Sequence, residues 1–330
     1  MKNSHLYYSV GALLYCPANS KTIADSIIHE RFGVRFSLAL CLEDTINDRY
    51  LTQAESILIQ TLQQLYQASQ SLDFFMPKIF IRVRTAAQII NLIDRLGSAA
   101  AILSGFILPK FDLQNANRYI QTAITINESC NHPFYIMPII ESPSVIDLRN
   151  RTNILYELKE SLTAIHGLVL NIRVGGNDLC HAFGFRRHSN ESIHQILPIE
   201  SIFSDIMTIF GMDYVVSGPV WEYYNGTGWD TGLRQELIED RLFGFVGKTV
   251  IHPKQIPFVN KAYAVSKEDY EDAKAILNWD DTSISMVSGN VEKNRMNECK
   301  THSNWAQKII YLSQIYGIDE PSDEQLLNIR

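Results

Sequence analysis

The sequence predicts an α/β fold, a TIM (β/α)8 barrel followed by a C-terminal helical extension. Eight apolar runs of strand length recur within about 260 of the 330 residues, as this barrel requires. A stretch with helical periodicity follows each run, and such alternation implies parallel strands. A doubly wound sheet would instead place a glycine-rich phosphate loop after the first strand, where the sequence is "YCPANS". The predicted strands are residues 11–16, 36–42, 79–83, 105–108, 134–140, 167–174, 214–217 and 245–251.

The predicted helices are recognised by apolar residues spaced three or four positions apart. In residues 85–96, Ala86, Ile89, Ile90 and Ile93 lie on one helical face. The same spacing, or a Ser-Pro start signal, predicts helices at residues 115–126, 144–158, 199–210 and 233–242.

The alternation ends near Lys267. The segment "SKEDYEDAKAILNW" predicts a helix capped by Ser266, and "WAQKIIYLSQIYGI" predicts a last helix. The polar stretch between them, "DDTSISMVSGNVEKNRMNECKTHSN", predicts an irregular linker. We therefore expect a barrel domain over residues 1–265 and a helical extension over residues 266–330.

The composition excludes several classes of function. The chain is 46% hydrophobic and 20% charged, with a net charge of −7 and a pI of about 5.7, which argues against nucleic-acid binding. No apolar run reaches the ~18 residues of a membrane span, and the N-terminus lacks a secretory signal. Five scattered cysteines without a CxxC pair indicate reduced thiols. We expect a cytoplasmic protein with no nucleic-acid or membrane partner.

Charged residues or a histidine follow the predicted strands at the end where TIM barrels carry their active sites. Polar residues are expected at any single turn, but their recurrence after six strands indicates a site. These residues are Glu43, Asp44, Arg82, Arg84, Lys110, Glu141, Asp178 and His252.

Arg82 and Arg84 share one face of the third strand by alternation. The outer face of a barrel strand packs under helices, so both guanidinium groups are expected in the barrel mouth. There they would bind a carboxylate or phosphate through two parallel hydrogen bonds. The alternative is an ion pair with Glu43 or Asp44.

Glu141 and Asp178 end neighbouring predicted strands. Two carboxylates without a cysteine or histidine beside them suit a hard cation, and magnesium takes one or two carboxylates and leaves the remaining positions to water and substrate. Gly175 and Gly176 let the chain turn tightly near such a ligand.

Arg173 lies on the same predicted face as the polar Asn171, so we expect its side chain inside the barrel. A buried guanidinium requires an anion. Its partner is predicted to be a substrate group, or Glu141, Glu43 or Asp44 when no substrate is present.

These ordered motifs resemble the HpcH/HpaI aldolase and citrate lyase beta-subunit superfamily of magnesium-dependent carbon–carbon bond lyases. The resemblance covers residues 11–260 and is strongest to the divergent branch associated with tellurite-resistance gene clusters. The motifs that carry it are "LALCLEDTI", "IRVR", "LPK", "PIIES", "GGNDL" and "WDTGLRQELIEDRLFGFVGKTVIHPKQI".

The resemblance implies a role for each candidate residue. Glu141 and Asp178 would hold Mg2+, with Glu141 also at the substrate. Arg82, Glu43 and Asp44 would be the catalytic residues. Arg82 would bind the carboxylate of the keto-acid fragment, and Glu43 and Asp44 would support the waters of the metal and the arginines. The implied reaction is a retro-Claisen or retro-aldol cleavage of a hydroxy-acid or acyl-CoA-type substrate through a metal-stabilised enolate. The resemblance also implies a homo-oligomer, a trimer or a hexamer.

The chain departs from the family pattern at three positions. Arg84 replaces an asparagine, Cys41 replaces an acid, and Arg173 replaces an apolar residue. The added positive charge predicts a small substrate with more negative charge, such as a second carboxylate or a phosphate. Arg84 and Arg173 are therefore candidate substrate-binding residues beside Arg82.

Two other functions stay open, as do the roles of two residues. The alternatives are a class II pyruvate-type aldolase and a catalytically silent metal- or ligand-binding barrel in a stress-response system. His252 is either a general base or a hydrogen-bonded residue that shapes the mouth. Glu298 is either a counterpart of the catalytic acid that some relatives take from a neighbouring subunit's tail, or a solvated glutamate.

Overall fold

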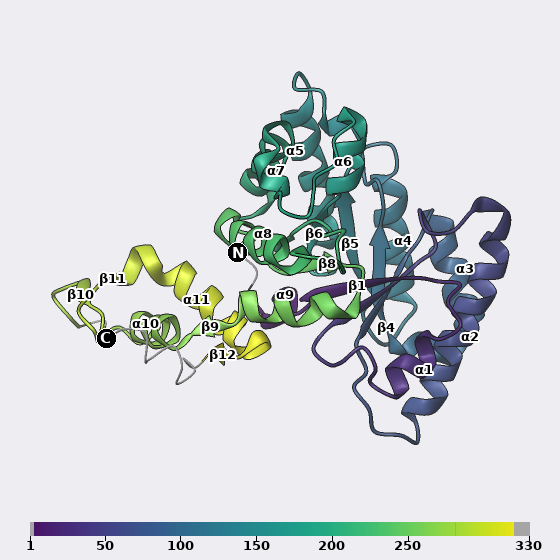
Figure 1. Cartoon of the computed structure of the whole chain (residues 1–330), viewed down its shortest axis with the longest axis horizontal. Helices are drawn as coiled ribbons and strands as arrows, with labels where there is room; N and C mark the ends of the chain where they lie inside the picture. Colours follow the sequence, from purple (N-terminus) through teal and green to yellow (C-terminus); the bar gives the residue numbers. More distant parts are fainter. Residues whose placement is uncertain (1–2, 281, 320–330) are drawn as a thin grey trace.

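From β1 to β7 each strand of the central sheet is hydrogen-bonded to the next strand in the chain, and β8 pairs with β1. The structure is a computed structural model that describes residues 3–280 and 282–319, and its sheet runs β7-β6-β5-β4-β3-β2-β1-β8 (Figure 1). A parallel bridge between Gly218 and Lys248 joins the chain after β7 to β8, so the sheet nearly closes as a barrel. The predicted TIM barrel is confirmed. Its strands are β1 (Ala12–Pro17), β2 (Ser37–Cys41), β3 (Lys78–Arg82), β4 (Leu103–Leu108), β5 (Tyr135–Ile140), β6 (Ile172–Val174), β7 (Val216–Ser217) and β8 (Lys248–Val250).

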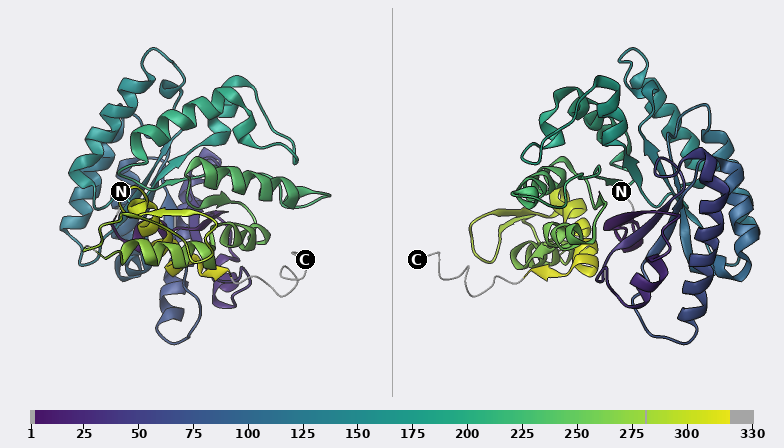
Figure 2. Two further views of the ribbon diagram at one scale, coloured as in Figure 1. Left: turned by 90° about the vertical axis from the view of Figure 1, so that its left-hand side faces the viewer. Right: turned by 45° about the vertical axis from the view of Figure 1, so that its right-hand side comes forward.

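Helices surround the strands (Figure 2). They are α1 (Ile23–Ile28), α2 (Leu51–Ser69), α3 (Ala86–Leu96), α4 (Ala116–Glu128), α5 (Arg151–Leu162), α6 (Gly176–Phe183), α7 (Leu197–Phe210), α8 (Trp229–Phe243) and α9 (Ile256–Tyr263). Short 3-10 turns connect them: η1 (His5–Tyr8), η2 (Asp48–Tyr50), η3 (Gly97–Ile102), η4 (Pro143–Val145), η5 (Thr163–Ile165), η6 (Ile193–Gln195) and η7 (Pro253–Gln255). In the described part of the chain no helix combines the length and the apolar character that a membrane span needs.

Several predicted elements differ in extent, and two of the differences have a visible physical cause or form. The strands predicted over residues 214–217 and 245–251 are shorter, and the helix predicted over residues 233–242 begins earlier, at Trp229. The helix predicted over residues 144–158 begins only at Arg151, because Asp147 accepts the Arg149 backbone N–H (3.1 Å) in a local turn that competes with the helix. The strand predicted over residues 167–174 is interrupted. Val169 makes an isolated bridge to Ile136, and regular pairing begins again at Ile172.

Side-chain alternation separates the barrel interior from the layer beneath the helices. Apolar residues fill the lower interior: Leu13, Ala39, Phe80, Ile107, Met137, Ile139 and Leu170. Tyr15 and Arg82 follow Leu13 and Phe80 by two positions, and Arg173 pairs in register with Ile139. These three polar side chains therefore stand on the inner face, towards the carboxyl ends of the strands.

A buried ionic cluster lies where the barrel closes. The Lys248 ammonium on β8 contacts Glu236 (2.8 Å) and Asp240 (2.7 Å) of α8, and all three side chains are fully buried. Asp240 also contacts His194 (2.8 Å), and Arg187 pairs with Glu236 (3.1 Å). The cluster holds α8 against the last strand, beside the Gly218–Lys248 bridge.

The C-terminal extension is more ordered than predicted. Ser266 caps α10 (Lys267–Leu277) as expected, by accepting the Asp269 N–H (3.1 Å). The expected irregular linker contains a hairpin of β10 (Val287–Gly289) and β11 (Met296–Glu298), and α11 (Cys299–Tyr316) begins before the predicted helix at Trp305. The Asn290 side chain accepts the Asn294 N–H (3.0 Å) and so shapes the hairpin turn.

The extension returns to the barrel after this hairpin. Helices α10 and α11 pack together, and β9 (Val265–Ser266) pairs with β12 (Ile318–Asp319). Tyr316 stacks near Tyr263 and donates to the Tyr8 carbonyl (3.4 Å). In Figure 1 the hairpin projects to the left, away from the barrel. Residues 320–330 of the predicted extension lie outside the described residues.

Lys248→Met should lower the free energy of unfolding by about 3–5 kcal/mol, because two buried carboxylates lose their shared ammonium. Chemical denaturation measures this loss. The control is Lys274→Met, whose exposed pair with Glu271 (3.4 Å) should contribute less than about 1 kcal/mol. Equal losses in both variants would contradict the role of the cluster in closing the barrel.

Candidate active site

Six charged side chains converge at the carboxyl end of the barrel. They lie at or just after the ends of β2 to β5 and in the first turn of α6, which follows β6. Ion pairs of 2.7 to 3.9 Å link them into one cluster. The six residues are Glu43, Asp44, Arg82, Lys110, Glu141 and Asp178.

Arg82 is at the centre of this cluster. Its Nη2 contacts Glu43 Oε2 (2.8 Å), Asp44 Oδ2 (3.1 Å) and Glu141 Oε1 (3.1 Å). Its Nε is buried without a hydrogen-bond partner among the described residues. The guanidinium therefore orients three carboxylates and keeps a donor for a further anion.

Glu141 is only 4% exposed, and its Oε1 also accepts the Lys110 backbone N–H (2.9 Å). Burial raises the pKa of Glu141 to about 7, and the charges of Asp178 and Glu43 act in the same direction, against the attraction of Arg82. A nearby cation would favour the ionised form of this carboxyl group.

Glycine is required at positions 175 and 176 because a side chain at either position would collide with neighbouring atoms. Gly175 has an ordinary φ of −95°, but a Cβ there would lie 2.1 Å from Glu141 Oε2. A Cβ on Gly176 would lie 2.6 Å from Ile193 and 2.9 Å from Pro219. The glycine pair thus lets the start of α6 pass directly over Glu141.

Lys110 was expected at the barrel mouth from the sequence, but no role was assigned to it there. Its Nζ contacts Glu43 Oε1 (2.7 Å) and Asp44 Oδ1 (3.2 Å) and lies 3.9 Å from Asp178 Oδ1. These acids raise its pKa against the effect of burial. Its φ of 46° is unfavourable for a lysine and accompanies the bond from its N–H to Glu141. The feature of the sequence that points to this residue is the "LPK" motif after the fourth predicted strand.

The cluster fits a divalent cation by charge and by ligand type. Four carboxylates face two cationic side chains, which leaves two negative charges in excess when every carboxyl group is ionised. Among the described residues no three His, Cys, Asp or Glu side chains are arranged to bind a metal together. Glu141 and Asp178 offer the two carboxylates that Mg2+ accepts when water and substrate complete its shell.

Glu43 and Asp44 differ in their affinity for protons. Burial raises the pKa of Glu43, and its hydrogen bond with Asp44 raises it further. For Asp44, burial is outweighed by that same hydrogen bond and by the charges of Arg82 and Lys110, so its pKa is lowered. Glu43 therefore takes up a proton more readily than Asp44 does.

Arg84 does not occupy the position expected of it beside Arg82. Strand β3 ends at Arg82, so alternation does not extend to Arg84. Its Nε donates to the Leu42 carbonyl (2.7 Å), its Nη1 pairs with Asp48, and its Nη2 donates to the Ile46 carbonyl. Its guanidinium holds the loop after β2 in place, and Arg84 lines a small cavity there together with Glu43 and Lys110. Its role in substrate binding stays a prediction.

Arg173 lies inside the barrel, as its alternation predicts, and is 1% exposed. Its Nη2 donates to Thr249 Oγ1 (2.6 Å). Asn171 donates to Ser217 Oγ (2.9 Å). The expected pairing of Arg173 with an acid of the site does not occur within the described residues.

His252 and Glu298 stand outside the charged cluster. His252 Nδ1 accepts the Lys254 N–H (3.1 Å) and caps η7, and its ring stacks on Tyr224 with centroids 4.8 Å apart. Burial lowers the pKa of His252. This geometry favours the structural role. Glu298 ends β11 in the extension, where its side chain makes no hydrogen bond or ion pair with any described residue.

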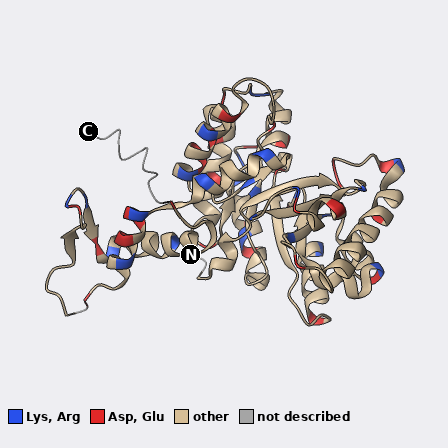
Figure 3. Ribbon diagram, turned by 60° about the horizontal axis from the view of Figure 1, so that its bottom comes forward, with Lys and Arg blue, Asp and Glu red and all other residues tan. Residues whose placement is uncertain are grey.

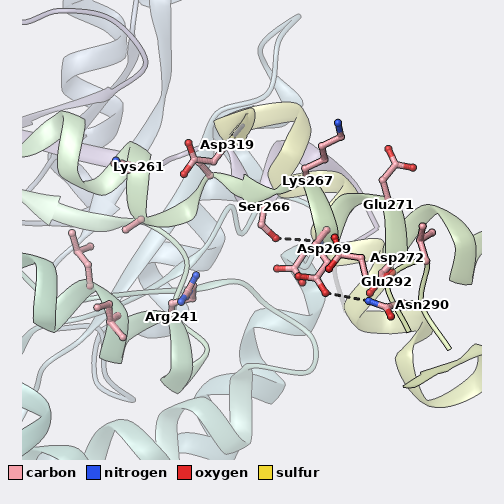
Figure 4. Close-up of a pocket in the computed structure, with 16 residues that line it drawn as sticks. Arg241, Lys261, Ser266, Lys267, Asp269, Glu271, Asp272, Asn290, Glu292 and Asp319 are labelled. Atoms are coloured by element: carbon pink, nitrogen blue, oxygen red, sulfur yellow. Dashed lines mark hydrogen bonds between the residues drawn. The ribbon is translucent and has the colours of Figure 1, made fainter. Parts of the chain in front are cut away.

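A cavity of about 850 Å³ lies away from these strand ends, between α8, α9 and the extension (Figure 4). Several acids line it, but Arg295 contacts Asp269 (2.8 Å) and Asp272 (2.5 Å). Charged residues of both signs are interspersed over the helices in Figure 3. Neither this cavity nor the helix surfaces gather charged side chains into a cluster like the one at the strand ends.

Gly175→Ala should displace Glu141 and weaken Mg2+ binding by more than about tenfold, because the new methyl group would overlap the carboxylate. Isothermal titration calorimetry with MgCl2 measures the affinity. Gly167→Ala is the matched control, since nothing lies within 4 Å of its Cβ position. Unchanged affinity in Gly175→Ala would show that Glu141 is not a ligand.

Glu141→Gln should stabilise the metal-free protein above pH 7. The pKa of Glu141 is about 7 in the folded state against 4.5 for the ordinary group, so burying its charge costs stability as pH rises from 4.5 to 7, and the full cost persists above. Thermal melts in chelator should therefore give a Tm difference, variant minus wild type, that grows between pH 5 and 8. A difference that shrinks with pH would contradict this assignment.

The sequence of this chain is similar to a known protein family, and its fold is similar to those of known proteins. Residues 4–318 match a family model described as the C–C bond lyases of the TIM-barrel fold. No curated protein matches the chain.

Three solved structures illustrate the likeness in fold. CitE of Mycobacterium tuberculosis, in complex with magnesium, acetoacetate and coenzyme A, has a TM-score of 0.61 and 19% identity over 94% of this chain and all of that one. The citrate lyase beta subunit of M. tuberculosis with oxaloacetate and magnesium has a TM-score of 0.52 and 18% identity, over 78% of this chain and 99% of that one. RipC of Yersinia pestis has a TM-score of 0.51 and 17% identity, over 78% and 95%.

Proposed function

Because the chain belongs to the C–C bond lyases of the TIM-barrel fold, we propose that it is a magnesium-dependent lyase that cleaves a small anionic substrate through an enolate. The substrate is a hydroxy acid or an acyl-CoA-type derivative, and the bond breaks by a retro-Claisen or retro-aldol step. The observation that carries this proposal is the excess of carboxylates at the strand ends, with Glu141 and Asp178 flanking the centre.

Similar folds support the choice of metal and substrate class. The mycobacterial proteins were solved with magnesium together with pyruvate, acetoacetate or oxaloacetate. Here Glu141 and Asp178 would hold the ion. When bound, Mg2+ would polarise the substrate oxygen and stabilise developing enolate charge.

The remaining residues of the cluster bind the substrate and orient the acids around it. Arg82 keeps Nε available for a substrate carboxylate while its Nη2 positions Glu43, Asp44 and Glu141. The pKa of Glu43 is raised and that of Asp44 is lowered, so Glu43 is the member of this pair that would accept a proton from the reacting fragment more readily. Lys110 neutralises the same pair.

Further features extend the proposal. All five cysteines are free, which supports the expected cytoplasmic location. On the resemblance of its ordered motifs, we also propose that the chain falls in the divergent branch associated with tellurite-resistance gene clusters. We retain a homo-oligomer, and a barrel domain of residues 1–265 with a separate extension of residues 266–330, as parts of the same proposal.

Enolate formation can be tested before the natural substrate is known. In D2O with MgCl2, the protein should exchange the methyl protons of pyruvate or of acetyl-CoA for deuterium, because a bound metal and Arg82 would stabilise the enolate of one of them. Proton NMR follows the loss of the methyl signal. The probe that exchanges identifies the keto-acid or the CoA-ester class.

Asp178→Asn should abolish both this exchange and Mg2+ binding by calorimetry, whereas Asp94→Asn, on the exposed face of α3, should change neither. A wild-type protein that binds Mg2+ but exchanges neither probe would reject the lyase and favour the silent binding barrel. Failure to bind Mg2+ would reject the lyase and would leave only a silent barrel that binds a ligand without metal.

A further inference from the structure

Arg173 differs from the other buried arginines in having no carboxylate partner within the described residues. Arg82 contacts three acids of the site, Arg151 pairs with Asp205 (2.9 Å), and Arg187 pairs with Glu236 (3.1 Å). Each of these charges is neutralised where it is buried. Arg173 is as buried as they are, at 1% exposed.

The immediate contacts of Arg173 are neutral hydroxyl groups. Its Nη2 donates to Thr249 Oγ1 (2.6 Å), and its Nη1 is buried without a hydrogen-bond partner. Tyr15 lies beside it, and the ring of Tyr15 also faces Arg82, whose Cζ is 6.0 Å from the ring centroid. Tyr15 therefore lies between the Arg82 guanidinium, which is paired with carboxylates, and the Arg173 guanidinium, which is not.

Packing alone does not explain a charge at this position. The inner face below it is apolar, with Ile139 in register on the neighbouring strand. A leucine would fill such a place without the cost of burying an uncompensated charge. An arginine cannot escape that cost by losing its proton. The arrangement is therefore built to receive an anion from outside the chain.

An anion that reaches Arg173 also meets two neutral donors. Tyr15 and Thr249 border Arg173, and both are partly exposed. Thr249 accepts a hydrogen bond from Arg173, so its own hydroxyl proton can point to a ligand. Burial raises the pKa of Tyr15 to about 12, so this phenol also remains a donor at neutral pH. The three groups together suit the two oxygens of a planar carboxylate.

We propose that Arg173, Tyr15 and Thr249 form a subsite for a second carboxylate of the substrate, separate from the carboxylate held by Arg82. The inference rests on the proposed function and adds the substrate class: dicarboxylic acids rather than monocarboxylic acids. The substrate neutralises Arg173, and the same contact aligns its other end with Glu141 and Asp178.

Malate and lactate test this subsite, because both are stable 2-hydroxy acids and only malate carries a second carboxylate. In MgCl2, calorimetry on the wild-type protein should give at least about tenfold tighter binding of malate. Arg173→Leu should reduce malate affinity to that of lactate and leave lactate and Mg2+ affinities unchanged. Thr249→Val should reduce the preference for malate in part. This variant provides the test of the subsite if Arg173→Leu does not fold.

Thermal stability separates a ligand site from a structural arginine. Arg173→Leu should raise the Tm of the ligand-free protein, since an uncompensated charge is removed. The matched control Arg151→Leu should lower the Tm, because Asp205 loses its partner, and should not alter the preference for malate. A lowered Tm together with an unchanged preference in Arg173→Leu and Thr249→Val would overturn the subsite.

The two proposals fail in different ways. Absence of Mg2+ binding by the wild-type protein rejects the proposed function. The subsite is then judged by metal-free melts, in which malonate should raise the Tm of wild type more than acetate does, and should lose this advantage in Arg173→Leu. Equal shifts by malonate and acetate in wild type would reject the subsite as well.

Discussion

The contacts of one guanidinium nitrogen, Arg82 Nη2, organise the site. Three carboxylates approach it from two different loops, and each would repel the others in its absence. Parallel strands bring their carboxyl ends to one rim of the barrel, so the fold supplies the meeting point. Neighbouring features follow from this crowding: the glycine at position 175 makes room for Glu141, and the backbone at Lys110 adopts an unfavourable angle to reach it.

Periodicity and strand ends were sufficient to predict the fold and the location of the site. All eight strands lie within or beside the predicted runs, because buried parallel strands need continuous apolar segments. Arg82 was also predicted correctly to face inward, since it lies within the paired strand and obeys alternation. The roles of the site residues as ligands and catalysts remain predictions.

Side-chain positions beyond the last paired residue were not predictable. Arg84 lies after β3, where alternation no longer applies, and the local carbonyl groups of the preceding loop determine where its guanidinium binds. Lys110 was expected at the mouth, but its contacts were not predictable for a similar reason. Its ammonium reaches acids from other strands across the mouth, and no spacing within one segment reports such a contact. The ordered hairpin in the extension arises from asparagine turn bonds that composition alone does not reveal.

The ionic cluster at the seam has a consequence for cooperativity. Separation of β8 from the barrel would leave the acids of α8 without Lys248, and the chain at β7 would lose its contact on the side away from β6 at the same time. In a half-open barrel, the free-energy cost of exposed sheet edges would therefore add to the cost of buried carboxylates that have lost their partner. Such an intermediate would be sparsely populated at equilibrium, so opening of this seam and loss of the whole site are expected as a single event.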